Sequence, residues 1–319
     1  MTQIILVTGG TGLVGSAIRR VIKNDDRIDN NIVFIFLSRQ DGDLTKEQDV
    51  INIFEKYKPT HIIHLAACVG GLYKNMNNNL KMYSENMKIN QNILHYGHKY
   101  GVIKIVSCLS TCIFPNKVTY PINESMLHDG LPHVSNEGYS FAKRMLDVES
   151  KLYNREYGTK FVSIIPTNVY GPFDNYSLID GHVIPSLIHK CFLAKRNKEK
   201  FIVYGSGRPL RQFIYSEDLA KLILWFLMES NSLDSIILSP KEEISIRDVA
   251  NMISEIFEYD DIIFDTSKSD GQIKKTVSNE KLMNLNPSFK FTLLKKGLLE
   301  TIEWFKENYE NIKKKKEIK

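Results

Sequence analysis

A tyrosine and a lysine stand four residues apart in YSFAK, at Tyr139 and Lys143. On a helix this spacing puts both side chains on one face. A lysine ammonium beside a phenol favours the phenolate, so the pair could exchange a proton although the free phenol titrates near about 10. Taken alone, the spacing favours a surface tyrosine and lysine, because it recurs in helices by chance.

A hydroxyl group and a thiol follow an apolar segment earlier in the chain. VIKIVS, residues 102–107, predicts a buried strand, and LSTCIFP after it carries Ser110, Thr111 and Cys112 in adjacent positions. A thiol with a reference pKa near about 8.5 exchanges protons usefully around neutrality. The alternative for Cys112 is a small buried hydrophobic side chain, the commoner role of cysteine.

A glycine-rich turn lies close to the start of the chain. TGGTGLVG, residues 8–15, follows the strand-like QIILVT and opens a helix from about Gly12. Glycines there allow a tight turn and bring backbone N–H groups close to a pyrophosphate at the positive end of the helix. The strand-turn-helix context favours dinucleotide binding over a plain turn. We predict that the cofactor is held by Gly9, Gly10, Thr11, Gly12, Leu13, Val14 and Gly15.

The residues after the second predicted strand bear on the choice of cofactor. FIFLSRQ places Arg39 where an NAD site usually has an acidic residue. A cation suits a 2′-phosphate, which favours NADP(H). Two alternatives stay open, a surface role for Arg39 and an NAD site built on Asp41 or Asp43. Asp43 and Leu44, in DGDL, are predicted to flank the adenine.

Short β-branched segments alternate with helical patterns over the first half of the chain. This alternation predicts an α/β fold, a Rossmann-type doubly wound parallel sheet with a smaller C-terminal α/β lobe for the substrate. Long helices are expected at 84–100 and 139–157, and a core strand at 236–238. We expect a dinucleotide-binding domain over 1–170, to which the chain returns around 213–240 and 276–294, and a mainly substrate-binding lobe over 171–319.

Composition excludes several classes of protein. The chain has 319 residues, 43% of them hydrophobic, and a net charge of only +5. The basic end, KKKKEIK, is interpreted as a frayed, solvated tail, so no nucleic-acid partner is expected. The four cysteines form no CxxC pattern and no zinc-ligand spacing, so we expect reduced thiols and no metal. The chain starts on a strand and has no long apolar segment, so we expect no membrane association and a cytoplasmic protein.

The order of these motifs resembles that of the extended short-chain dehydrogenase/reductases. A glycine-rich turn, a strand-end hydroxyl at Ser110 and a YxxxK pair about thirty positions later occur in that sequence. The resemblance implies that Ser110 and Tyr139 bind a substrate carbonyl oxygen and that Lys143 holds the nicotinamide ribose.

Within that superfamily the chain most closely resembles the GDP-L-fucose synthases. Dehydratases carry an Asp-Glu pair after the strand-end hydroxyl, and here that place holds Thr111 and Cys112. The resemblance rests on CLSTCIFP (108–115), HLAACVGG (64–71), PTNVYGP (166–172), DGHVIPSLIHK (180–190), RQFIYSEDLA (211–220) and SDGQIKK (269–275). It implies 3,5-epimerisation and NADPH-dependent 4-reduction of GDP-4-keto-6-deoxy-D-mannose. The alternatives are an NADP-dependent epimerase or reductase of another nucleotide sugar, and a non-catalytic dinucleotide-binding scaffold.

The resemblance also implies a role for each reactive side chain. C3 and C5 are α to the C4 ketone, and inversion needs a base and a different acid on opposite faces. Cys112 matches the family's base and His182 its acid, with the carbon served by each left open. Tyr139 would protonate the C4 oxygen during reduction. The alternative for His182 is a loop histidine that caps the following helix.

The remaining site residues are carried over from the same family. The cofactor site would also include Lys143, Pro166, Asn168 and His182. The substrate site would include Asn168, Val183, Leu187, Lys190, Tyr204, Arg211, Asp270 and Lys275. Two cations among Lys190, Arg211 and Lys275 suit a diphosphate, although scattered cations are usually just solvated. The resemblance further implies a homodimer paired through the two long helices.

Overall fold

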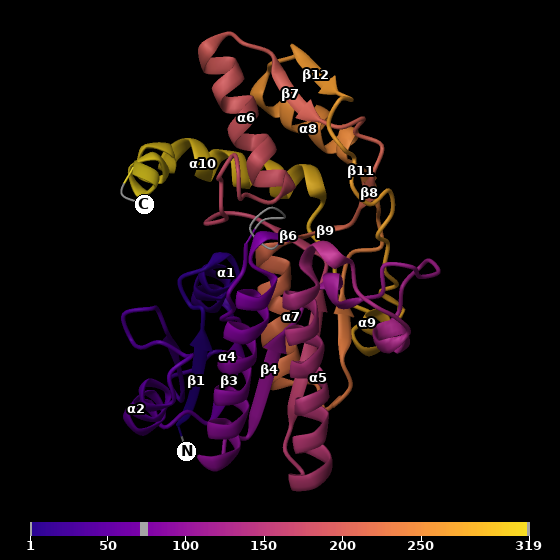
Figure 1. The fold of residues 1–319 in the computed structure, drawn as a ribbon. Helices are drawn as coiled ribbons and strands as arrows, with labels where there is room; N and C mark the ends of the chain where they lie inside the picture. The colour runs from indigo at the N-terminus through magenta and orange to yellow at the C-terminus, as the bar shows by residue number, and fades with distance from the viewer. Residues whose placement is uncertain (1, 71–75, 318–319) are drawn as a thin grey trace.

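The computed structural model of the protein describes residues 2–70 and 76–317, so Gly71 of the HLAACVGG segment lies outside the described residues. A layered α/β body carries a smaller lobe at one end, as Figure 1 shows. The strands are β1 (Gln3–Thr8), β2 (Ile32–Phe36), β3 (His61–His64), β4 (Lys104–Cys108), β5 (Phe161–Pro166), β6 (Asn168–Tyr170), β7 (Phe201–Tyr204), β8 (Leu210–Arg211), β9 (Phe213–Tyr215), β10 (Ile236–Leu238), β11 (Ile244–Ser245) and β12 (Ile262–Asp265). The α-helices are α1 (Leu13–Val21), α2 (Glu47–Tyr57), α4 (Asn79–Lys99), α5 (Glu137–Tyr157), α6 (Val183–Asn197), α7 (Ser216–Met228), α8 (Ile246–Phe257), α9 (Glu280–Leu285) and α10 (Leu294–Glu317).

The larger body is built on a parallel sheet with the strand order β10-β5-β4-β3-β1-β2. All the pairings in this sheet are parallel. The chain moves outward from β1 to β2 and then returns past β1 to β3. The order therefore reverses between β1 and β3, and ligands of such sheets bind beyond the carboxyl ends of the strands at this point. The predicted Rossmann-type doubly wound sheet is confirmed.

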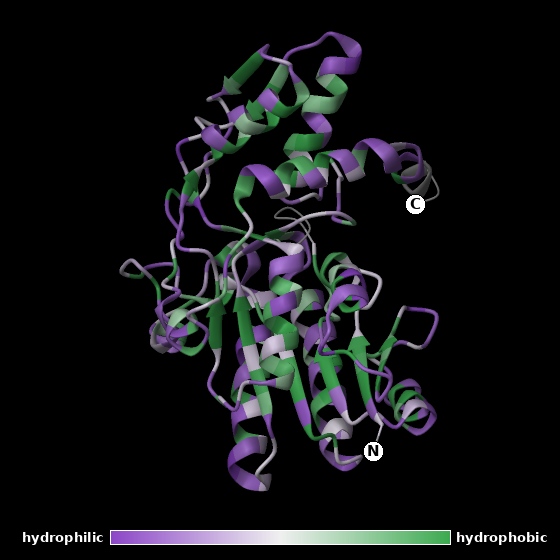
Figure 2. Cartoon of the chain, turned by 180° about the vertical axis from the view of Figure 1, so that it is seen from behind, coloured by the Kyte–Doolittle hydropathy of each residue, from purple (hydrophilic) through white to green (hydrophobic). Residues whose placement is uncertain are grey.

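Helices cover both faces of the sheet, because successive strand residues point to opposite sides and both sides are apolar. On one face Leu6 and Ile62 pack with helices α2, α4 and α5. On the other face Val7 and Ile63 pack with α1 and α7. Figure 2 shows the strands as a hydrophobic layer between helices that are polar on their outer sides.

The smaller lobe has a separate core. β7 pairs with β12 in parallel, and β8 pairs with β11 antiparallel. Helices α6, α8 and α10 enclose an aromatic-rich cluster that includes Phe201, Phe257 and Phe305. Between the two bodies β6 pairs with β9, after which α7 and β10 rejoin the main sheet. The substrate-side segments thus leave from the carboxyl end of β5.

Two helices differ from their predicted extents. α4 begins at Asn79, five residues before the expected start at 84, because Leu80 and Met82 in its first turn stand two residues apart, a spacing that indicates no helical period. α10 continues to Glu317, into the KKKKEIK segment that the sequence predicts to be a frayed tail; Ile318 and Lys319 of that segment lie outside the described residues. Lysine and glutamate are good helix formers and extend a helix that is already nucleated. In the part of the chain that the structure describes, no helix is both long and apolar enough to cross a membrane.

Candidate active site

The glycine-rich turn lies at the reversal point of the sheet. Gly9 has φ +67°, and a Cβ on it would lie 3.0 Å from the backbone nitrogen of Ala66, after β3. A Cβ on Gly10 would lie 2.6 Å from the Cβ of Phe36, at the end of β2. A Cβ on Gly15 would lie 2.6 Å from the Cα of Gly10. These three glycines are therefore required by the close packing of the turn itself.

Gly12 has a different setting, which fits a bound dinucleotide. It is the N-cap residue of α1 and supplies no side-chain hydrogen bond to the first turn. A Cβ on Gly12 would meet its nearest heavy atom only at 3.4 Å. The N–H groups at the start of α1 are thus left for a ligand, and the positive helix end attracts a pyrophosphate.

The loop after β2 leaves the side chain of Arg39 available. The Asp41 carboxylate accepts hydrogen bonds from the backbone N–H and the hydroxyl of Ser38, at 2.8 and 2.9 Å. Asp43 likewise accepts from the backbone and hydroxyl of Thr45. These bonds lower the pKa of both carboxyls and engage them within the loop. Arg39 is exposed and has no hydrogen bond or ion pair within the described residues, which favours a 2′-phosphate over a ribose hydroxyl there.

A buried hydrogen-bond chain, which the sequence did not reveal, joins this turn to α5. Thr8 Oγ1 accepts from the N–H groups of Leu65 and Ala66 and lies 2.8 Å from Nδ1 of His64. His64 Nε2 lies 3.2 Å from Asn90 Oδ1, and Asn90 donates to the carbonyl of Ala142. With both lone pairs of Thr8 used, its hydroxyl donates to Nδ1 and His64 is neutral. Burial lowers the pKa of His64 to about 3, with a smaller effect from the charge of Lys143.

The strand end at Ser110 is bound tightly to α5. Ser110 caps the short 3-10 turn Thr111–Ile113. Its hydroxyl oxygen accepts a hydrogen bond from the N–H of Cys112 at 3.5 Å. Lys143 Nζ donates to the carbonyl of Cys108 at 2.8 Å, and Ser140 donates to the carbonyl of Cys112 at 3.0 Å. Arg144 Nε donates to the carbonyl of Ile113 at 2.5 Å. Four of the predicted catalytic residues, Ser110, Cys112, Tyr139 and Lys143, therefore lie on two elements held together by these bonds.

The phenol of Tyr139 departs from the expected electrostatics. Lys143 was expected to lower its pKa, but burial raises that pKa well above its ordinary value, and Cys112 and Cys108 add to the rise. Lys143 Nζ lies 5.9 Å from the centroid of the Tyr139 ring and is engaged by a backbone carbonyl. Burial lowers the pKa of Lys143 in turn. The phenol is thus a proton donor in this state, with its hydrogen in place.

Several cations surround Cys112. The thiol interacts electrostatically with Lys143, Arg144 and Lys275. Lys275 was predicted to bind a diphosphate, and the structure brings it near both Cys112 and Arg211. Sequence reasoning missed Arg144, because its burial is visible only once α5 is packed against the 3-10 turn.

The predicted nucleotide contacts lie in the smaller lobe. Lys190 Nζ sits 3.5 Å from the ring centroid of Tyr204, and burial lowers the pKa of Lys190. Arg211 donates to the carbonyls of Leu210 and Gln272. Asp270 accepts from the N–H and hydroxyl of Ser206, at 2.6 and 2.7 Å, and so fixes the YGSG turn.

Residues at the border of the two bodies complete the predicted site. Pro166 ends β5, and Asn168 donates through Nδ2 to the carbonyl of Gln212 at 3.0 Å. On α6, Val183 is exposed and Leu187 is buried. His182 precedes α6 as its N-cap residue, and its ring lies 3.8 Å from Asp174. Among the described residues it has no hydrogen bond or ion pair with the four catalytic residues on β4 and α5.

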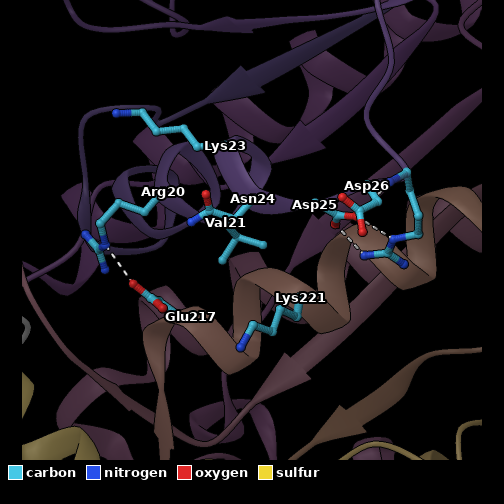
Figure 3. A pocket seen from close by; sticks show the side chains of 9 residues that line it. Arg20, Val21, Lys23, Asn24, Asp25, Asp26, Glu217 and Lys221 are labelled. Carbon is cyan, nitrogen blue, oxygen red and sulfur yellow. Dashed lines mark hydrogen bonds and ion pairs between the residues drawn. The ribbon is translucent and has the colours of Figure 1, made fainter.

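An open hollow of about 830 Å³ lies elsewhere, between α1 and α7 (Figure 3). Arg20 faces Glu217 across it in an ion pair of 2.8 Å, and Arg27 pairs with Asp25. None of the predicted site residues lines it. In residues 2–70 and 76–317, no cluster of three His, Cys, Asp or Glu side chains could hold a metal ion.

Comparison with known proteins agrees with this geometry. Residues 5–238 match the model of the NAD dependent epimerase/dehydratase family. A GDP-L-fucose synthase of Dictyostelium discoideum is 52% identical over 97% of both chains. The chain belongs to the NAD dependent epimerase/dehydratase family, among the GDP-L-fucose synthases. A Drosophila melanogaster protein described as "Probable GDP-L-fucose synthase" is 47% identical over 97% of this chain and 99% of that one.

A solved relative extends the likeness of this GDP-L-fucose synthase family member to three dimensions. The GDP-L-fucose synthetase of Naegleria fowleri, in a crystal structure bound to NADP, superposes with a TM-score of 0.92. The two are 47% identical, and the match covers 97% of this chain and 96% of that one. The family recognised from the sequence is confirmed.

Proposed function

We propose that the protein converts GDP-4-keto-6-deoxy-D-mannose into GDP-L-fucose by 3,5-epimerisation followed by NADPH-dependent reduction at C4. One observation carries the proposal. A thiol, Cys112, lies beside the Tyr139 and Lys143 pair at the end of β4, in a chain 52% identical to a GDP-L-fucose synthase. Reduction by itself needs only the tyrosine and the lysine. The thiol adds a base that can remove a proton from a carbon next to the ketone.

Epimerisation uses the C4 ketone as an electron sink. The Cys112 thiolate takes a proton from C3 or C5, and the electron pair moves onto the C4 oxygen as an enolate. The hydroxyls of Ser110 and Tyr139 donate to that oxygen, which stabilises the charge as it develops. His182 then gives a proton to the carbon from the opposite face, the ketone re-forms, and the carbon is inverted.

Reduction uses the same carbonyl. NADPH, held by the glycine-rich turn and the N-terminus of α1, supplies a hydride to C4 when bound. The raised pKa of Tyr139 keeps its proton available for the C4 oxygen. The Lys143 ammonium, fixed against the Cys108 carbonyl, binds the nicotinamide ribose and stabilises the phenolate that remains.

The smaller lobe binds the GDP portion. Lys190 and Arg211 offer cations to the diphosphate, and Tyr204, more than half exposed, offers its ring to the base or sugar. Asp270 supports this surface by holding the turn after Tyr204. Lys275 lies near both Arg211, which is proposed to bind the diphosphate, and Cys112. Residues 1–170 accordingly form the cofactor domain, to which the chain returns around 213–240 and 276–294. Residues 171–319 form mainly the substrate lobe.

A direct assay tests this function. The purified protein is incubated with GDP-4-keto-6-deoxymannose and NADPH, and the reaction is followed by NADPH absorbance and by chromatography of the product. We expect stoichiometric formation of GDP-L-fucose. No NADPH oxidation with this substrate, or oxidation only with a different nucleotide 4-ketosugar, would refute the proposal. Tyr139→Phe serves as the reductase-dead control.

The quaternary structure and cellular location belong to the same proposal. The outer faces of α4 and α5 expose Leu80, Tyr83, Leu152 and Tyr157, which suit burial in a homodimer of two copies. Size-exclusion chromatography with light scattering should give twice the chain mass. A catalytic thiol must stay reduced, so we place the enzyme in the cytoplasm. Recovery in a membrane or secreted fraction would contradict that location.

A further inference from the structure

We propose that Asp174 is the positioning residue for His182, holding its ring by Nδ1 and keeping it as the imidazolium that protonates the epimerised carbon. This inference rests on the function proposed above for the role of His182. The pairing of Asp174 with His182 is independent of that function, because it is seen in the geometry of the loop between β6 and α6.

The two side chains face each other with opposite exposure. Nδ1 of His182 lies 3.8 Å from Oδ1 of Asp174, an ion-pair distance that leaves room to shorten when a ligand binds. The side chain of Asp174 is only 4% exposed, whereas that of His182 is 66% exposed. The carboxylate therefore lies beneath the ring, and the opposite nitrogen, Nε2, is left for the substrate.

Asp174 has an oxygen that the rest of the protein does not use. Its Oδ1 accepts the N–H of Asn175 at 2.7 Å, but its buried Oδ2 has no hydrogen-bond partner within the described residues. Burying a carboxylate without a second partner is costly. A protonated histidine 3.8 Å from Oδ1 of the same carboxylate supplies charge that compensates this cost.

The loop is built to present this carboxylate. Phe173, immediately before Asp174, has φ +69°, a strained conformation for a bulky residue. Its ring packs on Trp304 of α10, with centroids 4.5 Å apart. After Asp174, the buried Tyr176 donates its hydroxyl to the carbonyl of Gly171. The chain thus keeps an unfavourable backbone angle at the one place that turns Asp174 inward.

The position of His182 explains why a carboxylate is needed. The residue is the N-cap of α6, whose first turn contains no acidic side chain. The positive end of a helix disfavours an imidazolium, so a histidine there would tend to be neutral. Asp174 opposes this effect and raises the pKa of His182, by hydrogen bonding first and by its charge in addition, against the lowering effect of burial.

Other charged groups near the loop are engaged elsewhere. Arg20 of α1 lies 5.3 Å from the Phe173 ring and pairs with Glu217 of α7. Lys190, two turns along α6, lies over the ring of Tyr204. Glu300 of α10 accepts from the hydroxyl of Tyr215. The exposed Asp180 is two residues from His182, but the rise in the pKa of His182 comes from Asp174.

The proton balance of the step follows. The Nε2–H bond of the imidazolium breaks as the enolate's electron pair forms the new C–H bond, and the C4 ketone is restored. Neutral imidazole remains, beside a carboxylate that favours its reprotonation by solvent. Asp174 touches neither substrate nor cofactor, so its loss should slow protonation at carbon and leave hydride transfer intact.

The test measures the pKa of His182 directly by NMR in protein labelled at its eight histidines, with the His182 signal assigned by its loss in His182→Gln. The wild type should titrate above 6.5, the ordinary value. Asp174→Asn keeps the acceptor for the Asn175 N–H and should lower that pKa. Asp180→Asn, the matched control, removes one charge from the same loop and should change the pKa much less. A wild-type value below 6.5, an unchanged pKa in Asp174→Asn, or an equal fall in Asp180→Asn would overturn the pairing.

Activity measurements then test its use. In Asp174→Asn, the rate of solvent deuterium incorporation at C3 and C5 should fall about tenfold to a hundredfold. The alkaline limb of the pH profile of this rate should move to lower pH. The rate at which this variant reduces a 4-ketosugar that is already epimerised should stay within about twofold of the wild-type rate, because hydride transfer does not use His182. Equal loss of both steps would refute the positioning role. If the wild type shows no turnover but the pKa of His182 still depends on Asp174, only the proposed function is refuted.

Discussion

Lys143 Nζ lies 2.8 Å from the main-chain oxygen of Cys108, so the ammonium on α5 is fixed to the end of β4. The same strand end continues into Ser110 and Cys112, and the helix carries Tyr139 one turn earlier. This bond, together with those of Ser140 and Arg144, sets the spacing between the two halves of the site. The residues proposed for hydride transfer and for proton transfer therefore share one support.

Replacing Lys143 by methionine tests that support. Methionine fills a similar volume, and the loss of a buried charge offsets much of the cost of leaving the Cys108 carbonyl unpaired, about 1–3 kcal/mol. We expect a folded protein whose rate of 4-reduction falls about a hundredfold or more, because the phenolate loses its stabilising cation. Steady-state NADPH oxidation measures this, with the exposed Lys200→Met as the control. A variant with wild-type reductase rates would exclude Lys143 from catalysis.

Two glycines of the nucleotide turn should respond differently to alanine. A Cβ on Gly10 would lie 2.6 Å from the Cβ of Phe36, so Gly10→Ala should destabilise the fold by about 1–3 kcal/mol. A Cβ on Gly12 has its nearest neighbour at 3.4 Å, so Gly12→Ala should fold normally and lose NADPH affinity. Thermal unfolding and fluorescence titration with NADPH separate the two effects. Normal NADPH binding by Gly12→Ala would show that the pyrophosphate does not approach this turn.

The buried His64 predicts a specific dependence of stability on pH. Its pKa is about 3 in the folded chain, against about 6.5 when unfolded. Between these values the unfolded chain binds a proton that the folded chain excludes. The stability from this residue is therefore complete above pH 6.5 and is lost as pH falls toward 3, at up to about 1.4 kcal/mol per pH unit.

Urea unfolding across that range measures the slope. His64→Gln removes the titrating group, so its free energy of unfolding should fall less steeply with decreasing pH than that of the wild type. The exposed His128→Gln should keep the wild-type slope. Parallel slopes for wild type and His64→Gln would mean that the folded and unfolded chains protonate His64 alike, so that its pKa is not lowered by folding.

The sequence predicted the features that depend on local order along the chain. The period-2 apolar strands, the glycine spacing of residues 8–15 and the YSFAK helix each follow from neighbouring residues, and the parallel sheet follows from their alternation. The resemblance to the GDP-L-fucose synthases then supplied candidate roles for Cys112 and His182, which neither spacing nor composition could supply.

The parts that could not be predicted depend on packing between distant segments. Asp174 lies in a loop eight residues before His182, a separation with no periodic meaning, and it follows Phe173, whose φ is positive. The Thr8, His64 and Asn90 chain joins three elements. The rise in the pKa of Tyr139 could not be predicted from the sequence either, because it comes from burial of the phenol and from the neighbouring Cys112 and Cys108.

We propose that Cys112 makes this reductase an epimerase as well. The decisive measurement compares two substrates for the wild type and Cys112→Ser, a hydroxyl being a far weaker base than a thiol at neutral pH. The account predicts that Cys112→Ser incorporates solvent deuterium at C3 and C5 at least about a hundredfold more slowly, yet reduces a pre-epimerised GDP-4-ketosugar at close to the wild-type rate. Equal losses with both substrates, or unchanged deuterium incorporation, would contradict it.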